Sequence, residues 1–312
     1  MLARPSSLWA KALVKQSPIF HSGAMHEGGV MSHLIYSDTV CALGEGPLWH
    51  PWEEALYWFD ILGSRLYRRD THGERHWQFD RHVSAAGWVE SGKLLIASER
   101  DLFLFDTDSG SEEHVVDLEA DNAVTRSNDG RADPWGGFWI GTMGKAAEPE
   151  AGAIYRFFKG ELRRLYADIT ISNAICFAPG GAYAYFCDTD THRIQRVALD
   201  GDGWPAADPV TFVDLAPEGL KPDGAVVDTQ GNLWNAQYGA GRVACYNPEG
   251  KFMTAAGLAA GQITCPAFGG TGFTTLFATS AADGAAPNDP FAGQTFSVPM
   301  GFVGQREHQV KL

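Results

Sequence analysis

The sequence predicts an all-β protein, a six-bladed β-propeller with four-stranded antiparallel blades around a central channel. A pattern of turn, short aromatic strand, tight connection and second strand recurs about six times, at spacings of roughly 40–50 residues. The 312 residues include 36 Gly, 18 Phe and 10 Trp, a composition typical of aromatic strands joined by glycine-rich turns. No long stretch with helical periodicity interrupts the repeats.

The copies of this pattern follow one another along most of the chain. They begin at His50 (HPWEEALYWFD), Glu90 (ESGKLLIASERD), Asp133 (DPWGGFWIGTMG), Ala178 (APGGAYAYFCDTD), Asp228 (DTQGNLWNAQY) and Gly269 (GGTGFTTLFATS). Each copy is typical of an antiparallel sheet, which cannot bury both of its faces alone. Radial stacking buries both faces and leaves only short edges, as in a propeller. A seven-bladed ring and a pair of β-sandwiches are the alternatives.

The N-terminal part of the chain divides into two segments. The strand-like segment HLIYSDTVC, residues 33–41, precedes the first copy, and we expect it to complete the last blade and close the ring. Residues 1–31 lack the blade pattern and contain no acidic residue before Glu27, and Lys11 breaks their only apolar run, so a signal peptide is not expected. We interpret residues 1–31 as a disordered extension, or as the result of a translation start assigned too far upstream. We interpret residues 32–312 as a single propeller domain.

Composition excludes several classes of function. The net charge of −14 argues against a nucleic-acid partner, although an acidic surface names no substrate. No segment approaches the run of about 18 apolar residues that spans a membrane, so no membrane partner is expected. The five cysteines lack CxxC spacing and several lie in strand-like apolar runs, which predicts reduced core thiols and a cytoplasmic location. We expect His50 and His192 in turns or at the surface, and an outer hairpin turn within residues 106–117.

Four polar residues occupy equivalent places in different blades. The stretch KPDGAVVD, residues 221–228, places Asp223 between Pro and Gly, which on local grounds is turn chemistry. Other blades carry Glu45 in GEGPLW, Asn128 in RSNDGRADP and Asn173 in ISNAICFAP, each several residues before the actual turn. Because the first strand of every blade lines the channel, we expect these side chains to converge at one mouth.

Glu45, Asn173 and Asp223 together offer two carboxylates and one amide carbonyl. Oxygen donors without His or thiolate suit a hard cation such as Ca²⁺, Mg²⁺ or Mn²⁺. Without a cation, two carboxylates at close range repel each other, and one of them takes up a proton. We therefore predict one divalent cation as cofactor, with Ca²⁺ preferred and Zn²⁺, Mn²⁺ and Mg²⁺ as alternatives.

Several motifs in this order resemble those of the senescence-marker-protein/gluconolactonase family, which includes regucalcin and bacterial sugar-acid lactonases. The segments that carry the resemblance are GEGPLW, RSNDGRADPWGGFWIGTM, ISNA, PDGAVVD, GNLW and GRVACYNP. The resemblance extends from about residue 34 to 304, with the motifs distributed over separate blades. It implies a six-bladed propeller with one divalent metal at the channel mouth, and hydrolysis of a sugar lactone.

The resemblance also assigns roles to individual residues. It places the metal on Glu45, Asn173 and Asp223, gives Asp223 a second role as general base, and makes Arg126 and Asn128 substrate-contacting residues. A metal-coordinated lactone carbonyl is more electrophilic, and Asp223 would accept a proton from the attacking water.

One motif departs from the family pattern. Regucalcin-like members carry an acidic lid residue after GTM, and here Ala146 stands in GKAAEP where that acid is expected. Lys145 and Glu148 are the remaining candidates for lid contacts.

Other functions are compatible with the same pattern. The alternatives are a calcium-binding regulatory protein without turnover, a propeller phosphotriesterase-like hydrolase, and a scaffold for protein partners. Arg126 and Asn128 beside Asp223 favour an enzyme, because binding of a cation alone requires no substrate-side residues. The small-molecule partner predicted for the leading hypothesis is a sugar lactone.

Overall fold

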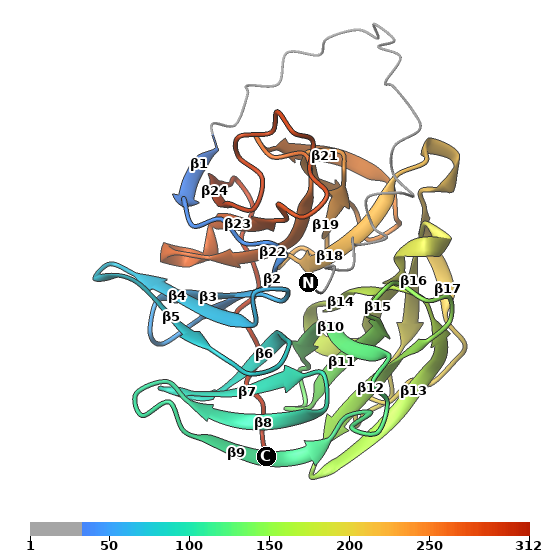
Figure 1. Cartoon of the computed structure of the whole chain (residues 1–312). Coiled ribbons are helices and arrows are strands. Elements are labelled where there is room, and N and C mark those ends of the chain that lie inside the picture. The colour runs from blue at the N-terminus through green and yellow to red at the C-terminus, as the bar shows by residue number, and fades with distance from the viewer. Residues whose placement is uncertain (1–32) are drawn as a thin grey trace, which may run out of the picture.

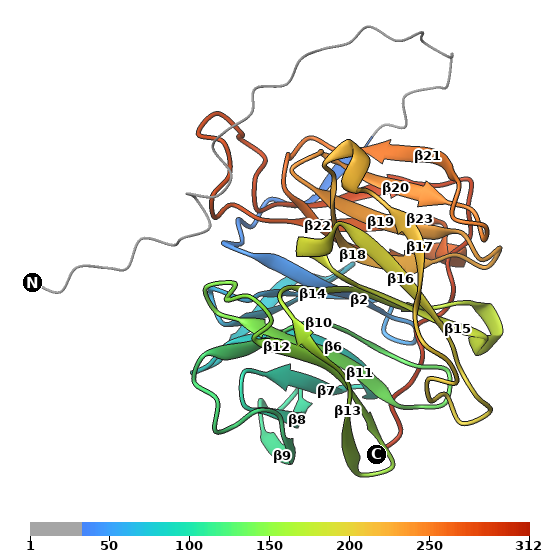
Figure 2. The same ribbon diagram turned by 90° about the vertical axis from the view of Figure 1, so that its right-hand side faces the viewer.

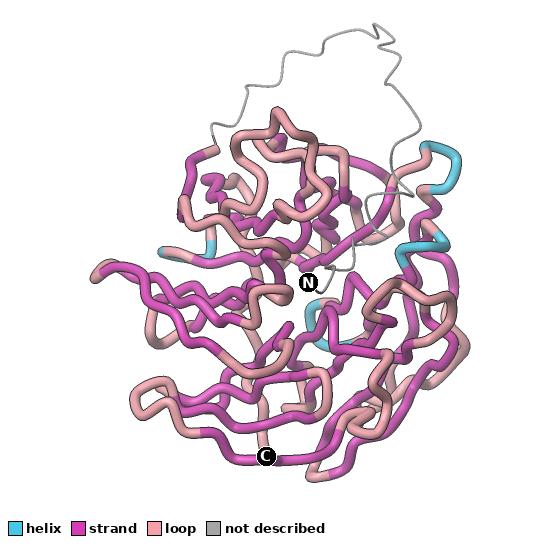
Figure 3. Tube along the Cα trace, in the orientation of Figure 1, coloured by secondary structure: helices cyan, strands magenta, loops and turns pink. Residues whose placement is uncertain are grey.

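The computed structural model describes residues 33–312. The prediction made for residues 1–31 lies outside these described residues. In the described part, six four-stranded antiparallel sheets form a ring, so the protein is an all-β six-bladed propeller as the sequence predicts (Figure 1). Strands account for most of the regular structure, with a few short helical turns (Figure 3). Within these residues no helix is both long and apolar enough to cross a membrane.

In the first three blades, consecutive strands are neighbours, with the first strand innermost. Blade 1 contains β2 (Gly44–His50), β3 (Ala55–Asp60), β4 (Arg65–Asp70) and β5 (Gly73–Gln78). Blade 2 contains β6 (Val83–Glu90), β7 (Lys93–Ser98), β8 (Asp101–Asp106) and β9 (Glu112–Asp117). Blade 3 contains β10 (Thr125–Ala132), β11 (Phe138–Gly144), β12 (Gly152–Phe158) and β13 (Glu161–Ile169).

The remaining blades complete the ring, and the last one joins the two ends of the propeller sequence. Blade 4 contains β14 (Ser172–Phe177), β15 (Tyr183–Asp188), β16 (Arg193–Ala198) and β17 (Val210–Asp214), and blade 5 contains β18 (Lys221–Val227), β19 (Leu233–Tyr238), β20 (Arg242–Tyr246) and β21 (Phe252–Gly257). Blade 6 contains β22 (Ile263–Gly269), β23 (Thr275–Ser280), β24 (Thr295–Pro299) and β1 (Leu34–Ser37). The antiparallel pairing of β1 with β24 confirms the expected closure by residues 33–41.

Four 3₁₀ turns connect strands of this ring. They are η1 (Pro179–Gly181), η2 (Thr189–Thr191), η3 (Ala216–Glu218) and η4 (Thr271–Phe273). The loop between β8 and β9 is a hairpin turn, as expected for residues 106–117.

The core lies between blades. Each pair of neighbouring blades shares a cluster of buried side chains, as where Phe59 of blade 1 and Phe103 of blade 2 belong to one cluster, and Trp139 and Phe186 join blades 3 and 4. All five cysteines are buried and free, so they are core thiols as expected. Because every sheet buries both faces against its neighbours, the ring holds the inner strands in a fixed register around the channel.

The C-terminal segment, residues 300–312, crosses the ring at the end of the channel opposite the site described below. It hydrogen-bonds to residues of five blades, namely Phe273, Val227, Phe177, Gly136 and Trp88. Its Glu307 carboxylate is buried and pairs with the Arg131 guanidinium of β10. Figures 1 and 2 show this segment leaving blade 6 and running past the inner strands toward blade 3.

Candidate active site

The inner strands are irregular at one mouth of the channel. The register with the second strand shifts between Glu45 and Leu48, Val83 and Ala85, Ser127 and Gly130, Asn173 and Cys176, Pro222 and Ala225, and Ile263 and Pro266. A β-bulge redirects side chains and interrupts pairing, which is why bulges are frequent beside functional sites. Asp223 therefore belongs to an inner strand with such a bulge, and not to a turn.

Left-handed backbone accompanies two of these bulges. Gly46, next to Glu45, has a φ of 53°, and a Cβ there would collide with the Ser84 carbonyl oxygen, so the close approach of blades 1 and 2 requires glycine. Ala174, next to Asn173, has a φ of 58°, a strained value for a residue with a side chain. The strain lies beside the polar side chains that the bulges turn into the channel.

Two buried carboxylates face the channel from opposite sides of the mouth. The Glu45 Oε2 accepts a hydrogen bond from Gly46 N at 3.1 Å, and the Asp223 Oδ1 accepts one from Gly224 N at 3.0 Å. Burial, and then the Asp129 carboxylate, raise the pKa of Glu45 to about 8. Burial, and then Glu45, raise the pKa of Asp223 well above its usual range. Each carboxylate thus requires a proton or a cation.

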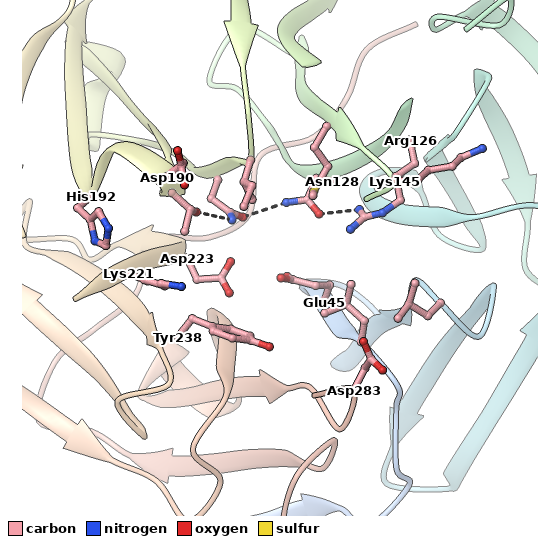
Figure 4. Close-up of a pocket in the computed structure, with 16 residues that line it drawn as sticks. Glu45, Arg126, Asn128, Lys145, Asp190, His192, Lys221, Asp223, Tyr238 and Asp283 are labelled. Carbon is pink, nitrogen blue, oxygen red and sulfur yellow. Dashed lines mark hydrogen bonds between the residues drawn. The ribbon is translucent and has the colours of Figure 1, made fainter. Parts of the chain in front are cut away.

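A chain of hydrogen bonds links three blades across the mouth. The Arg126 Nη1 donates to Asn128 Oδ1 at 2.7 Å, and the Asn128 Nδ2 donates to Asn173 Oδ1 at 3.2 Å. The Asn173 Nδ2 donates to Thr189 Oγ1 at 2.9 Å, and that hydroxyl donates to the Pro222 carbonyl at 2.7 Å. Figure 4 shows the bonds between these side chains. The amide oxygen of Asn173 is therefore directed away from Thr189.

Arg126 is a buried cation without a carboxylate partner among residues 33–312. Besides Asn128, its guanidinium donates to the Ser127 carbonyl at 2.9 Å. Burial lowers the pKa of Arg126 to about 10, and Glu45 and then Asp223 act in the opposite direction. The guanidinium remains charged at neutral pH and presents donors to the same pocket as the two carboxylates.

One pocket collects the residues that the sequence analysis assigns to the site, which come from four blades (Figure 4). Glu45, Arg126, Asn128, Asn173 and Asp223 all line it. The pocket has further walls that sequence reasoning missed, formed by Leu43, Leu62, Met143, Ile171, Thr189, Asp190, Lys221, Tyr238 and Asp283.

The lid candidates and the two histidines differ in their placement. Lys145 lines the pocket and forms an ion pair with Glu99 at 2.9 Å. The Glu148 carboxylate accepts a hydrogen bond from Ala146 N at 3.0 Å and does not line the pocket.

His50 is fully buried, so the prediction of a turn or surface position is wrong, because the ring packs this side chain against Trp88. His192 follows η2, as expected of a turn residue, but lines the pocket.

The donor set at the mouth contains oxygen atoms only. Within the described residues no three His, Cys, Asp or Glu side chains form a group that could hold a metal ion. At the mouth the Asn173 amide would complete the set begun by Glu45 and Asp223. Carboxylate and amide oxygens are ligands for hard divalent cations, and a cation would relieve the repulsion between the two carboxylates.

The protein is thus a six-bladed propeller with a candidate ligand pocket at one mouth of its channel, and buried polar side chains line this pocket. Residues 43–282 match the family described as the SMP-30/gluconolactonase/LRE-like region, and the chain belongs to this family. A Rhizobium meliloti (strain 1021) protein, provisionally named a sugar lactone lactonase, is 39% identical over 289 residues, 88% of this chain and 96% of the relative. The 6-deoxy-6-sulfogluconolactonase of Pseudomonas putida is 32% identical over 272 residues, 85% of this chain and 94% of the relative.

A solved structure has the same architecture. The crystal structure of a calcium-binding protein, regucalcin, from Agrobacterium tumefaciens str. C58 superimposes with a TM-score of 0.88 at 36% identity. The match covers 90% of this chain and 98% of that protein. The six-bladed fold is therefore shared over nearly the whole length of both chains.

Proposed function

We propose that this protein hydrolyses a sugar lactone to the sugar acid with the help of one divalent cation. The observation that carries the proposal is the pairing of two buried carboxylates, Glu45 and Asp223, with the Asn173 amide and the Arg126 guanidinium in one pocket. Membership of a family whose relatives carry lactonase names supports the reaction class.

Glu45, Asn173 and Asp223 would hold the cation. Their oxygen donors suit Ca²⁺, Mg²⁺ or Mn²⁺, and Zn²⁺ also binds such sets in vitro. Ca²⁺ is favoured because the structurally similar regucalcin is named a calcium-binding protein. When bound, a divalent cation at this place polarises the lactone carbonyl and stabilises negative charge on its oxygen.

The side chains of the pocket would perform the proton transfers and the orientation of the substrate. Asp223 accepts a proton from water while the water oxygen bonds to the lactone carbonyl carbon. The ring C–O bond then breaks, and the same proton passes to the departing ring oxygen, so that the product is a hydroxy acid. Arg126 and Asn128 hold the sugar hydroxyls, which places the carbonyl carbon within reach of the water.

A panel of sugar lactones tests this proposal. Hydrolysis releases acid, which a pH indicator follows continuously, with and without chelator and against the spontaneous rate of each lactone. We expect turnover of at least one lactone, its loss in chelator, and its recovery when excess Ca²⁺ or Mn²⁺ is added. Turnover that persists in chelator would contradict the metal requirement, and absence of turnover across the panel would contradict the lactonase function.

A second candidate function is cation binding without turnover, and the similarity to a structure named as a calcium-binding protein favours it. The two functions differ in one outcome of the same experiment. A binding protein would be stabilised by Ca²⁺ but would leave every lactone at its spontaneous rate.

A further inference from the structure

We propose that the pocket is built for a lactone that carries an anionic substituent, a carboxylate or a sulfonate, on the carbon chain remote from the ring carbonyl. Lys221 would bind this substituent. The inference rests on the lactonase function proposed above and names the substrate class of the same site. It arises from one cation in the pocket that the proposed reaction does not use.

Lys221 occupies a place from which it can reach a substrate. It begins β18, two residues before Asp223, and both residues line the pocket. The bulge between Pro222 and Ala225 turns Asp223 toward the channel, where it lines the same pocket as Lys221. Figure 4 shows the Lys221 ammonium on the Asp223 side of the pocket. The ammonium can therefore contact the far end of a substrate whose carbonyl lies at Asp223.

The Lys221 ammonium is uncompensated. Among residues 33–312 it forms no ion pair or hydrogen bond, although its residue is half-buried. Lys145, the other lysine of the pocket, is neutralised by Glu99 at 2.9 Å. A lysine that lines a pocket without an acidic partner is complementary to an acidic ligand.

The residues around Lys221 hold its strand in place and add a second polar wall. Tyr238 lies directly opposite Lys221 on the neighbouring strand β19 and lines the pocket. The His192 Nδ1 lies 2.6 Å from the Leu220 carbonyl, and because a carbonyl only accepts, this nitrogen is protonated and donates. His192 thereby ties blade 4 to the residue that precedes Lys221.

Two further carboxylates restrict where an anionic group can lie. Asp190 is exposed at η2, and Asp283 lies on the side of blade 6, away from Lys221 in Figure 4. Asp223, Asp283 and Glu45 all act electrostatically on the Tyr238 hydroxyl, so the part of the rim that suits a negative group is the one at Lys221. The similar Pseudomonas putida protein is named for a sulfo-substituted gluconolactone, a substrate of this charge class.

The experiment compares three lactones with the wild type and two variants. The substrates are neutral D-glucono-γ-lactone, D-glucaro-γ-lactone with a free carboxylate, and a sulfogluconolactone, so that the two anionic groups are separated. We expect the wild type to have a higher kcat/KM for at least one anionic lactone than for the neutral one. Lys221→Gln should lower that ratio about tenfold, mainly through KM, because a hydrogen bond to a charged group is lost. Lys251→Gln, an exposed lysine of blade 5, is the matched control.

Binding of the products gives a readout that does not depend on turnover. The dicarboxylate D-glucarate should raise the melting temperature more than D-gluconate does, and Lys221→Gln should remove the difference. If the wild type hydrolyses neutral lactones but Lys221→Gln leaves both the ratio and the product difference unchanged, the inference is wrong and the lactonase function stands. If the wild type hydrolyses no lactone, the function itself is wrong, and the inference with it.

Discussion

The amides of Asn128 and Asn173 meet between blades 3 and 4, with the Nδ2 of Asn128 3.2 Å from the Oδ1 of Asn173. On its other side, the Nδ2 of Asn173 donates to the Thr189 hydroxyl at 2.9 Å. These two bonds allow only one orientation of the Asn173 amide, with its oxygen on the side of Asn128. A residue that would ligate a cation through its amide oxygen needs such an orientation, and neighbouring blades supply it.

Thr189→Val tests this positioning role. Valine keeps the shape of threonine but leaves the Asn173 Nδ2 without an acceptor at this place, so the amide is no longer fixed. Loss of a partner that orients a metal ligand costs about 10–100-fold in metal affinity, and we expect a loss of this size for Ca²⁺. Calorimetric titration of the chelator-stripped protein measures it. Thr191→Val, at an exposed threonine of the same turn, should leave the affinity unchanged.

Asp223→Asn addresses the proposed general base. Asparagine retains the oxygen that accepts from Gly224 N, and the Asn235 amide still holds the bulge through the carbonyl of residue 223 at 2.9 Å. The fold should therefore persist while hydrolysis falls by about 10²–10⁴-fold, the usual contribution of a general base. Steady-state rates and circular dichroism give the two readouts, and Asp214→Asn on the outer strand of blade 4 is the control. Rates near those of the wild type would remove Asp223 from catalysis.

Much of the fold can be predicted from the sequence because each blade repeats the same aromatic strand and turn. The repeats fix a common register, and a common register brings Glu45, Asn173 and Asp223 to one mouth without any knowledge of side-chain geometry. Closure by β1 is predictable for a related reason. The strand pattern of residues 33–41 precedes the first blade, so this strand can pair only with the last blade, as β1 does with β24.

The rest of the site depends on contacts between blades that no local pattern encodes. Lys221 and Thr189 lie in strand or turn motifs, and the roles that we propose for them depend on the approach of blade 4 to blade 5. The C-terminal segment, residues 300–312, has no blade periodicity, yet it bonds to five blades, which are distant in sequence. His50 shows the same limit, because its burial comes from Trp88 of the next blade.

His50 should make the fold sensitive to acid. Burial lowers the pKa of His50 below its usual value of about 6.5, and its Nδ1 accepts from Glu53 N at 3.2 Å, which only the neutral ring permits. As the pH falls below about 6.5, His50 is protonated in the unfolded chain before it is protonated in the folded protein. The stability that neutral His50 contributes to the fold is therefore lost progressively as the pH approaches the lower pKa of the folded state.

The variant His50→Asn keeps an acceptor for Glu53 N but cannot titrate. We expect its melting temperature to fall less than that of the wild type between about pH 7 and pH 5, while the exposed His72→Asn follows the wild type. Parallel curves for His50→Asn and the wild type would show that His50 does not contribute.

Glu307→Gln should destabilise the whole ring. Arg131 and Glu307 pair below the site with side chains only 9% and 6% exposed, so removal of one charge leaves the other buried. Such a change costs about 3–5 kcal/mol, and we expect the lower end because the Asp129 carboxylate also interacts with Arg131. Urea unfolding measures the loss. The double variant Arg131→Met/Glu307→Leu should recover only part of the loss, because the buried Asp129 carboxylate then loses its interaction with Arg131. The exposed Glu249→Gln should change stability by less than about 0.5 kcal/mol.

Glu45→Gln tests whether a cation binds at the mouth of the channel through the Glu45 carboxylate. In the cation-free protein, burial and then the Asp129 carboxylate raise the pKa of Glu45, whereas burial and then Glu45 raise the pKa of Asp223. A cation that binds only the folded chain should stabilise the wild type by about 2.7 kcal/mol at a hundredfold excess over its dissociation constant. Chelator-stripped protein is therefore titrated with Ca²⁺, Mg²⁺, Mn²⁺ and Zn²⁺ while the melting temperature is followed. Glutamine removes one charge and much of the repulsion, so the stripped variant should melt at or above the stripped wild type and gain far less from each ion. An equal gain in Glu45→Gln and the wild type would place the cation elsewhere.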